Sequence, residues 1–399
     1  NINISFFYRK NGHEIINASK SNKSVPLSDV MIIFKTTNQA CDWLKTRLCH
    51  NISLNNVPHS PILVFKLNMR YGNSSLILTD ASFNNCLFHI VNTNVIFTNC
   101  SFQQTPLHAL AGGYKTSYSL KITNSIFLNM ETIDRPMSNT IRGIGYDTVT
   151  IESCKIQVHI GVPTFSFLLI RNVYHFKVVR CTFTTRPPYQ QPQRNQKTVA
   201  SLFNITHIFI LYSIFKYIPT SVFKVTQNYF LWVTHTLFLE CSSEKSFAKN
   251  EGKSCIVYAI KLQNVAHAFC ENVTFFHNDG AMSPATLGGE RRGILHINSC
   301  IFKHNKCAIW ASRTPKIYLT SSIISYHHGS NALFDKIGYV SAVMYLHLVG
   351  EIYLENNIFS HNKATEDFTK PYDSNTLTYK GGTVRPFPFI SLLLIPLPD

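Results

Sequence analysis

The hydrophobic pattern of the chain is a short frame that recurs from about residue 76 to residue 359. The stretch Val95-Ile-Phe-Thr-Asn-Cys-Ser-Phe102 is typical. With its last aromatic residue numbered zero, apolar residues occupy positions minus seven and minus five, a polar residue usually occupies minus three, and a small residue occupies minus two. Eleven copies fit, with position zero at Phe83, Phe102, Phe127, Ile156, Phe183, Phe215, Phe238, Phe275, Phe302, Ile324 and Phe359. Successive copies are about 28 residues apart on average, and a period between about 20 and 50 residues indicates a solenoid or an array.

Each copy predicts two short strands. Apolar residues two positions apart are typical of a strand with one buried face. The polar residue at minus three breaks this alternation, and Asn, Asp or Ser there suits a bend, because such residues tolerate left-handed backbone or bond to their own chain. A second strand then begins in a new phase, with positions minus two and zero pointing inward. Stacked pairs of this kind predict one coil of a parallel β-helix. A β-propeller blade needs about 40 residues, and β-sandwiches show no single fixed frame.

The frame resembles that of the right-handed parallel β-helix proteins of the pectin-lyase-like superfamily. In those proteins a hydrophobic strand, an Asn-containing turn and a small-x-aromatic strand recur. The resemblance implies an all-β fold, a right-handed parallel β-helix solenoid of about eleven coils with an N-terminal cap. It implies no particular activity, since the superfamily includes polysaccharide lyases and hydrolases, phage tailspikes, adhesins and non-catalytic surface proteins.

Three segments follow from where the frame begins and ends. Residues 1–70 lack the frame and are expected to cap the open end of the solenoid, with short strands and a helix over Thr36–Arg47. Residues 71–365 form the β-helix, and residues 366–399 form a C-terminal tail or cap. Long insertions are expected at Asn129–Asp147, at Thr184–Thr198, after Phe238 and at Gly280–Gly293, and loops of this kind often carry function.

The charge of the chain favours an anionic partner. There are 37 Lys and Arg residues against 21 Asp and Glu residues, a formal net charge of +16. Such a surface attracts acidic polysaccharide, nucleic acid or an anionic membrane, although an unselected basic surface is an equally good interpretation. The acidic residues are scattered, so the paired carboxylates of a hydrolase are not found. No cofactor or metal is expected, and nucleic acid is not the expected partner.

The outward position minus six provides the candidate binding residues. In the second half of the chain this column is rich in rings, which is typical of a stacking platform for sugars or of an association surface; an insertion folding across it is the alternative. Lys121, Lys177, Arg171 and Arg180 are candidates for a basic strip that binds a polyanion. The predicted ligand-binding residues are Phe209, Trp232, Phe269, Tyr318, Tyr353, Lys121 and Lys177. The outward minus-one column is also apolar (Ile126, Ile214, Leu237, Ile301, Ile323 and Ile358), so a covering element or contact with a second copy of the chain is expected there.

Cysteines and sequons indicate an oxidising, extracellular compartment. Cys41 with Cys49, and Cys241 with Cys255, are predicted local disulfides, and with 11 cysteines at least one thiol stays unpaired within the chain. Cys100, Cys154, Cys181 and Cys300 occupy the inward minus-two column as small apolar fillers, and Cys154 and Cys181 lie in neighbouring coils, near the Cα separation that a disulfide needs. Glycosylation is predicted at Asn3, Asn17, Asn22, Asn51, Asn73 and Asn204.

Histidine recurs after the closing aromatic residue in His277-Asn278, His304-Asn305 and His361-Asn362. A metal site would need two or three converging ligands. Since no carboxylate shares this column, a ladder of polar turn residues is the preferred interpretation.

The favoured hypothesis is a secreted or cell-surface β-helix glycoprotein that binds an anionic glycan, or a cell-surface or matrix protein, without catalysis. The alternatives are a polysaccharide-degrading enzyme, a lyase more than a hydrolase, and a structural rod of a larger adhesin or matrix protein. Convergence of three or more titratable residues on one face would favour the enzyme. The chain starts at Asn1 without an apolar leader, as expected for a processed protein, and has no apolar run of 18 residues.

Overall fold

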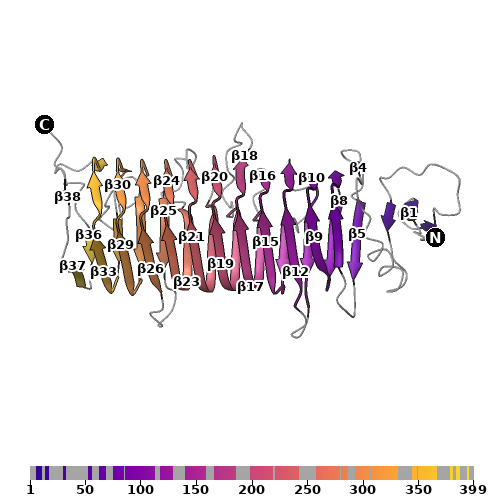
Figure 1. Cartoon of the computed structure of the whole chain (residues 1–399), viewed down its shortest axis with the longest axis horizontal. Helices are drawn as coiled ribbons and strands as arrows, with labels where there is room; N and C mark the ends of the chain where they lie inside the picture. The colour runs from indigo at the N-terminus through magenta and orange to yellow at the C-terminus, as the bar shows by residue number, and fades with distance from the viewer. Residues whose placement is uncertain are drawn as a thin grey trace.

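The protein consists of β-strands throughout the part of the chain that the structure describes (Figure 1). The computed structural model describes residues 6–10, 14–17, 30–32, 53–55, 63–68, 75–84, 86–112, 117–128, 140–158, 166–185, 198–218, 221–241, 258–278, 280–285, 293–305, 307–330, 344–347, 349–365, 378–380, 383–386 and 393–394. No helix occurs among these residues, so the all-β prediction is confirmed for them.

Each copy of the frame contributes a leading, a middle and a closing strand. The leading strands are β5 (Leu63–Asn68), β8 (Cys86–Val91), β11 (Leu107–Leu110), β14 (Ile141–Ile144), β25 (Gly280–Ala285), β28 (Cys307–Ser312), β32 (Met344–His347) and β36 (Thr378–Lys380). The middle strands are β6 (Ser75–Thr79), β9 (Asn94–Thr98), β12 (Ser119–Thr123), β15 (Thr148–Glu152), β26 (Ile294–Asn298), β29 (Lys316–Thr320), β33 (Glu351–Glu355) and β37 (Thr383–Pro386). In four copies the leading and middle strands are continuous, as β17 (Leu168–Val179), β19 (Ala200–Leu211), β21 (Phe223–Thr234) and β23 (Tyr258–Glu271).

The closing strands are shorter and form a sheet of their own. They are β4 (Ser53–Asn55), β7 (Ser82–Asn84), β10 (Ser101–Gln103), β13 (Ile126–Leu128), β16 (Lys155–Val158), β18 (Thr182–Thr185), β20 (Ile214–Lys216), β22 (Leu237–Leu239), β24 (Thr274–Phe276), β27 (Ile301–Lys303), β30 (Ile323–Ser325), β34 (Ile358–Ser360) and β38 (Leu393–Leu394). The five remaining strands are β1 (Phe6–Lys10), β2 (Glu14–Asn17), β3 (Val30–Ile32), β31 (His328–Ser330) and β35 (Lys363–Thr365).

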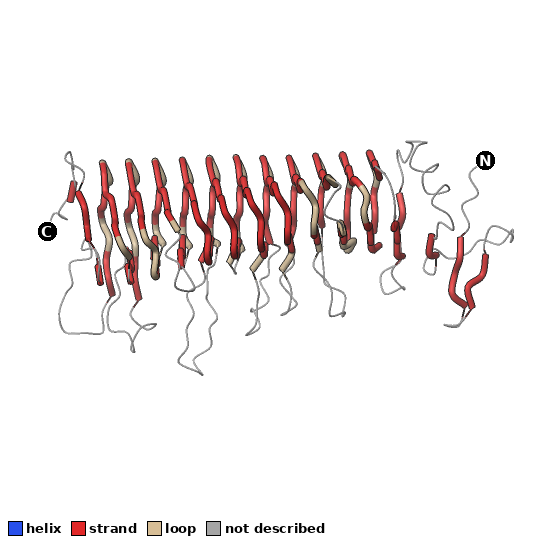
Figure 2. The backbone as a smooth tube through the Cα atoms, turned by 90° about the horizontal axis from the view of Figure 1, so that it is seen from below, coloured by secondary structure: helices blue, strands red, loops and turns tan. Residues whose placement is uncertain are grey.

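Equivalent strands of successive copies pair in parallel, so the copies stack in sequence order (Figure 2). Leading and middle strands belong to a 23-stranded sheet and closing strands to a 13-stranded sheet. Register is kept along the stack; for example, Phe183 pairs with Phe215 and Phe215 with Phe238. Among the described pairings, only those of β1 with β2 and β3 are antiparallel. The arrangement is consistent with a β-solenoid.

The core lies between the sheets and is filled by the four inward positions of the frame. The residues at minus seven, minus five, minus two and zero are buried in every copy. Phenylalanines at position zero stack face to face, as Phe215, Phe238 and Phe275 do with ring centroids 5.1 and 4.9 Å apart. Where Ile156 interrupts this column, Phe167 contacts the rings of Phe127 and Phe183 edge-on. The predicted inward pattern is therefore confirmed.

The bend between the middle and closing strands is a single residue with left-handed backbone. Every minus-three residue has a positive φ angle between 49° and 54°: Asp80, Asn99, Asn124, Ser153, Arg180, Tyr212, His235, Asn272, Ser299, Ser321 and Asn356. Such angles are adopted most readily by Asn, Asp and His and cost more for residues such as Arg and Tyr. The stacked copies on both sides hold these less suited residues in the same conformation.

Polar side chains inside the bends satisfy the backbone that the bends leave unpaired. Asn305 Oδ1 accepts from the backbone N–H of Asn278 at 2.8 Å, and Asn305 Nδ2 donates to the carbonyl of Phe275 at 2.9 Å. Asn362 does the same for the N–H of His327 and the carbonyl of Ile324. Buried backbone groups must be paired, so these asparagines form the polar turn ladder that the repeated His-Asn pairs predicted.

The sequence frame missed the leading strands. Ile141–Ile144 and Gly280–Ala285 lie inside two of the predicted insertions, yet they form β14 and β25 and pair with their neighbours. Parallel pairing also reaches into both terminal segments, since β5 pairs with β8 and β37 pairs with β33. The predicted helix over Thr36–Arg47 lies outside the described residues. The division at residues 70 and 365 stays a prediction.

Candidate functional site

The minus-six residues form one continuous outward column on the middle strands. Strand register places Lys121 beside Thr150, Thr150 beside Lys177 and Lys177 beside Phe209. The column continues through Trp232, Phe269, His296, Tyr318 and Tyr353. All seven predicted binding residues therefore lie on one line, although Lys121 and Lys177 are two strand spacings apart, about 10 Å.

The second half of this column is a stack of parallel rings. The centroids of Phe269, His296, Tyr318 and Tyr353 follow one another at 4.5, 4.6 and 4.6 Å, with interplanar angles of 1°, 3° and 6°. Rings in this arrangement cover each other's faces and leave mainly their edges to solvent. A sugar packs against a ring face, so these four rings are better suited to stabilising the stack than to forming a sugar platform.

A more open group of rings lies at the centre of the face. Trp232 is 39% exposed and inclined by 46° to Phe209. Tyr174 and Tyr229, at 50% and 58% exposure, stand beside this part of the column. Lys177 Nζ lies 5.8 Å from the centroid of the Phe209 ring, within cation–π range. We call Tyr174, Lys177, Phe209, Tyr229 and Trp232 the central patch.

The central patch carries no negative charge of its own. The middle-strand portions of β17, β19 and β21 contain no Asp or Glu, and the neighbouring strands β15 and β23 supply Glu152 and Glu271. Glu152 forms an ion pair with Arg180 at the bend that follows. Arg180 is therefore already paired, and the cation that the patch presents is Lys177.

The C-terminal end of the column is more nearly neutral. Lys316 Nζ lies 3.3 Å from a carboxylate oxygen of Glu351. The Tyr353 hydroxyl donates a hydrogen bond to the same carboxylate. An acidic ligand is therefore attracted less strongly near Tyr353 than at the central patch.

Two histidines border the central patch and form a cluster with Lys177. The rings of His175 and His207 are 5.0 Å apart on neighbouring strands, and Tyr174 packs against both. Burial lowers the pKa of His175, and the nearby His207 and Lys177 lower it further. Three titratable groups therefore converge on one face, the feature that would favour an enzyme. A neutral imidazole accepts a proton, and an ammonium neutralises a carboxylate.

Histidine burial predicts a pH dependence of stability. The pKa of His296 is also lowered, first by burial and then by His267. As pH falls below about 6.5, the unfolded chain takes up these protons before the folded protein does. Folding stability should therefore fall with pH until the folded-state pKa values are passed. Urea unfolding between pH 8 and pH 5 measures this, and a His175→Gln/His296→Gln variant should show a weaker dependence. An unchanged dependence would contradict the assignment.

The leading strands carry Arg171, which the sequence had already singled out, and other basic residues that the sequence frame did not identify. Lys224 and Lys261 are direct neighbours in register on β21 and β23. The Arg171 guanidinium lies 5.0 Å from the centroid of the Phe203 ring on β19. Arg142 is half-buried on β14, and its Nε has no hydrogen-bond partner in the described structure. We call Arg142, Arg171, Lys224 and Lys261 the cationic track, which extends about 19 Å along the stack.

Among the described residues of this face, no acid balances the track. The described leading strands contain no Asp or Glu, whereas the middle strands contain Glu152, Glu271, Glu351 and Glu355. On β17, Arg171 precedes the bend at Asn172, and the part of the strand with Lys177 follows it. The cationic track and the central patch therefore flank the same bend. The signal in the sequence was the lack of acids within these short segments, but it has meaning only once the segments are known to be strands.

The closing-strand face exposes a row of isoleucines. Ile126, Ile214, Ile301, Ile323 and Ile358 are each 38% or 39% exposed. Within the described residues nothing covers them, so self-association through this face stays a prediction. At the adjoining corner, the outward rings of His277, His304, Tyr326 and His361 stack at 4.6 to 5.1 Å. The described part of the chain holds no group of three or more metal-binding side chains arranged to hold an ion.

The predicted disulfides and glycosylation sites stay predictions. Cys41, Cys49 and Cys255 lie outside the described residues. Cys241 is a buried free thiol that donates to the carbonyl of Phe215 at 3.2 Å, and burial raises its pKa. Of the sequons, Asn17 ends β2. Asn204 is exposed at a left-handed bend, and its Nδ2 donates to Asn172 Oδ1 at 2.9 Å. The other predicted sites, Asn3, Asn22, Asn51 and Asn73, lie outside the described residues.

Comparison of the chain with models of protein families, with curated proteins and with solved structures gives no match. Where the structure describes the chain, no helix is long and apolar enough to cross a membrane.

Proposed function

We propose that the protein is a secreted or cell-surface right-handed parallel β-helix glycoprotein that binds an anionic glycan without catalysis. In this proposal the solenoid has about eleven coils and an N-terminal cap, and its fold is that of the pectin-lyase-like superfamily. The recurring frame, the left-handed bends and the parallel register support the fold. The location outside the cell is supported by the sequons and by the cysteine spacing.

The observation that carries the binding proposal is the acid-free cationic track beside the central patch. Four cations stand on one face whose described leading strands carry no carboxylate, so their field adds over about 19 Å instead of cancelling. Across the bend, Lys177 and the exposed rings of Tyr174, Trp232 and Tyr229 offer charge and apolar surface together. Sugar rings carry both apolar faces and anionic groups, which match this combination.

A glycan fits the cationic track better than nucleic acid does. Single-stranded nucleic acid is usually held by exposed aromatic side chains that stack on its bases, and the ring of Phe203 on this face is already covered by Arg171. A duplex winds its phosphates around an axis, so cations spread along one face of the stack meet one strand only once per turn. An extended acidic glycan can lie along that face, where Arg142, Lys224 and Lys261 share one register column and Arg171 lies two residues away from it. A protein partner with an acidic surface is the other ligand that this charge accommodates.

One observation favours a second candidate, a polysaccharide lyase. His175, Lys177 and His207 converge on the middle-strand face. A β-elimination needs a base beside an acidic sugar and a cation that neutralises its carboxylate. The described residues do not group acids into the Ca²⁺ site that often assists such a reaction.

The proposal is tested by binding the full chain to immobilised acidic and neutral glycans at two salt concentrations, with product analysis on any polyuronate that binds. We expect retention on acidic glycans that weakens as salt rises, without new reducing ends or unsaturated products. Unsaturated products would show that the protein is a lyase and not a non-catalytic binder. If no glycan binds, the remaining hypothesis is the structural rod.

A further inference from the structure

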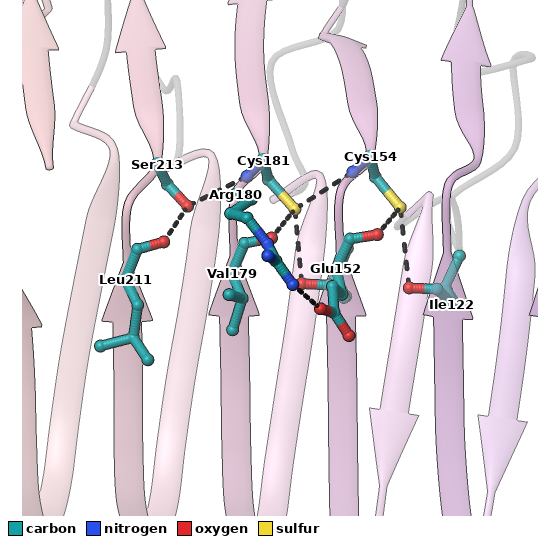
Figure 3. Close-up of polar contacts among 9 residues, drawn as sticks. Ile122, Glu152, Cys154, Val179, Arg180, Cys181, Leu211 and Ser213 are labelled. Atoms are coloured by element: carbon teal, nitrogen blue, oxygen red, sulfur yellow. Dashed lines mark hydrogen bonds and ion pairs between the residues drawn. The ribbon is translucent and has the colours of Figure 1, made fainter. Parts of the chain in front are cut away.

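The inward minus-two column contains two cysteines on neighbouring strands. Most other members of this column are also small residues. In chain order the minus-two residues are Ala81, Cys100, Ser125, Cys154, Cys181, Ser213, Thr236, Val273, Cys300, Ser322 and Asn357. Only Cys154 and Cys181 are neighbouring cysteines in this column. Strand register fixes the juxtaposition, because Glu152 pairs with Val179 just before the two cysteines and Lys155 pairs with Thr182 just after them (Figure 3).

The separation of the two residues suits a covalent bond. Adjacent strands lie about 4.8 Å apart, within the range of about 4.4 to 6.8 Å between Cα atoms that disulfides span. The backbone N–H of Cys154 already donates to Cys181 Sγ at 3.5 Å. Cys154 Sγ instead points to the carbonyls of Glu152 and Ile122, at 3.2 and 3.7 Å (Figure 3). Turning Cys154 about its Cα–Cβ bond to another staggered position releases only these weak thiol hydrogen bonds.

We propose that Cys154 and Cys181 form a disulfide when the chain folds in an oxidising compartment. The oxidant is a small-molecule or protein disulfide such as oxidised glutathione. The Cys181 thiolate attacks one sulfur of that disulfide and expels the first thiol, leaving a mixed disulfide. The Cys154 thiolate then attacks Cys181 Sγ and expels the second thiol. The two cysteines are oxidised by two electrons, and the protons they lose are taken up by the two thiols released.

The contact between the two residues is consistent with this order of attack. Interaction with Cys154, including the N–H that donates to its Sγ, lowers the pKa of Cys181. Interaction with Cys181 and burial raise the pKa of Cys154. Where the two strands are already paired, Cys181 is therefore the thiol that ionises more readily.

Burial decides when the bond forms. Both side chains are 1% exposed, so an oxidant reaches them while this part of the chain folds or during local opening. The bond would join β16 to β18 and close the segment between residues 154 and 181, which includes the middle strand that carries Lys177. On the outside of the same bend, the Arg180–Glu152 ion pair already joins these two copies. The inference does not depend on what the central patch binds.

The test follows the thiols of the full chain during refolding from the reduced, denatured state in reduced and oxidised glutathione. Free thiols are trapped by alkylation at successive times, and peptides are mapped by mass spectrometry without reduction. We expect a peptide pair joined through Cys154 and Cys181, lighter by two hydrogens than the sum of its parts. The oxidised protein should also unfold a few degrees higher than the same protein kept in reductant.

Two serine variants provide matched controls. Cys181→Ser places in the column the residue that already stands at Ser125 and Ser213, and it should remove the Cys154–Cys181 cross-link and reduce the redox dependence of thermal unfolding. Cys100→Ser alters an unpaired member of the same column and should leave both unchanged. Complete alkylation of Cys154 and Cys181 after oxidative refolding, or a bond from either one to a different cysteine, would overturn the proposal. The trapped peptides give this answer even for molecules that do not finish folding.

Discussion

Replacing Phe238 with alanine should lower the free energy of unfolding by about 3 to 5 kcal/mol, the usual cost of truncating a buried aromatic residue. The Phe238 ring is fully buried between the rings of Phe215 and Phe275. The Phe223 ring lies nearly perpendicular to it, with the two ring centroids 6.3 Å apart. Truncation removes the contacts on both faces at once. Urea or thermal unfolding of the variant and of the unchanged protein measures the loss.

The position of this loss can be measured as well as its size. Copies in a solenoid contact mainly their neighbours, so amide hydrogen exchange should accelerate most in β20, β22 and β24. Leu239→Ala provides a control on the same strand, because Leu239 points outward and is half-exposed; we expect a loss below about 1 kcal/mol there. Equal losses from the two variants would show that the inward and outward faces have been assigned wrongly.

The inward frame could be predicted because it depends on local rules. A period of two marks a buried strand face, and a short polar residue at minus three marks a left-handed bend. The bend is left-handed even at Arg180 and Tyr212, residues that do not favour it by themselves. At these two positions the stacked neighbours, and not the local sequence, hold the backbone.

The leading strands could not be predicted from the same frame. They follow insertions of variable length, so they have no constant offset from position zero. Their own alternation is also brief, as in β11, where only Leu107 and Ala109 point inward. Parallel pairing with the previous copy is what makes such a segment a strand, and this interaction is not local in the sequence.

The orientation of the rings could not be predicted from the sequence pattern either. The spacing placed Phe269, Tyr318 and Tyr353 in one column, which the structure confirms, but it could not show that their rings lie parallel and cover one another's faces. The same limit applies to the basic residues. Lys177 was identified because it shares the column with Phe209, whereas Lys224 and Lys261 lie on the leading portions of β21 and β23, which the pattern did not reveal.

Reversing the charge of Lys224 and Lys261 should weaken binding to an acidic glycan about 10- to 100-fold at low salt, a loss of roughly 1.4 to 2.7 kcal/mol. The two lysines are neighbours in register, and the described leading strands of their face contain no carboxylate. The Lys224→Glu/Lys261→Glu variant therefore removes half of the cationic track and places two negative charges on the face that also carries Arg171 and Arg142. Binding titrations at two salt concentrations measure the change, which should shrink at high salt because screening weakens the attraction and the repulsion alike.

A matched control separates the track from the overall charge. The Lys155→Glu/Lys216→Glu variant changes the net charge by the same amount, but its residues lie on β16 and β20 of the closing-strand sheet. If the cationic track binds the glycan, this control should keep most of the affinity, since exposed charges farther away than about 10 Å are largely screened at 0.1 M salt. Equal losses from both variants would show that the net charge alone attracts the glycan. If only a Lys177→Glu variant loses affinity for the glycan, the binding site is the central patch and not the cationic track, because the two faces meet only at the bend.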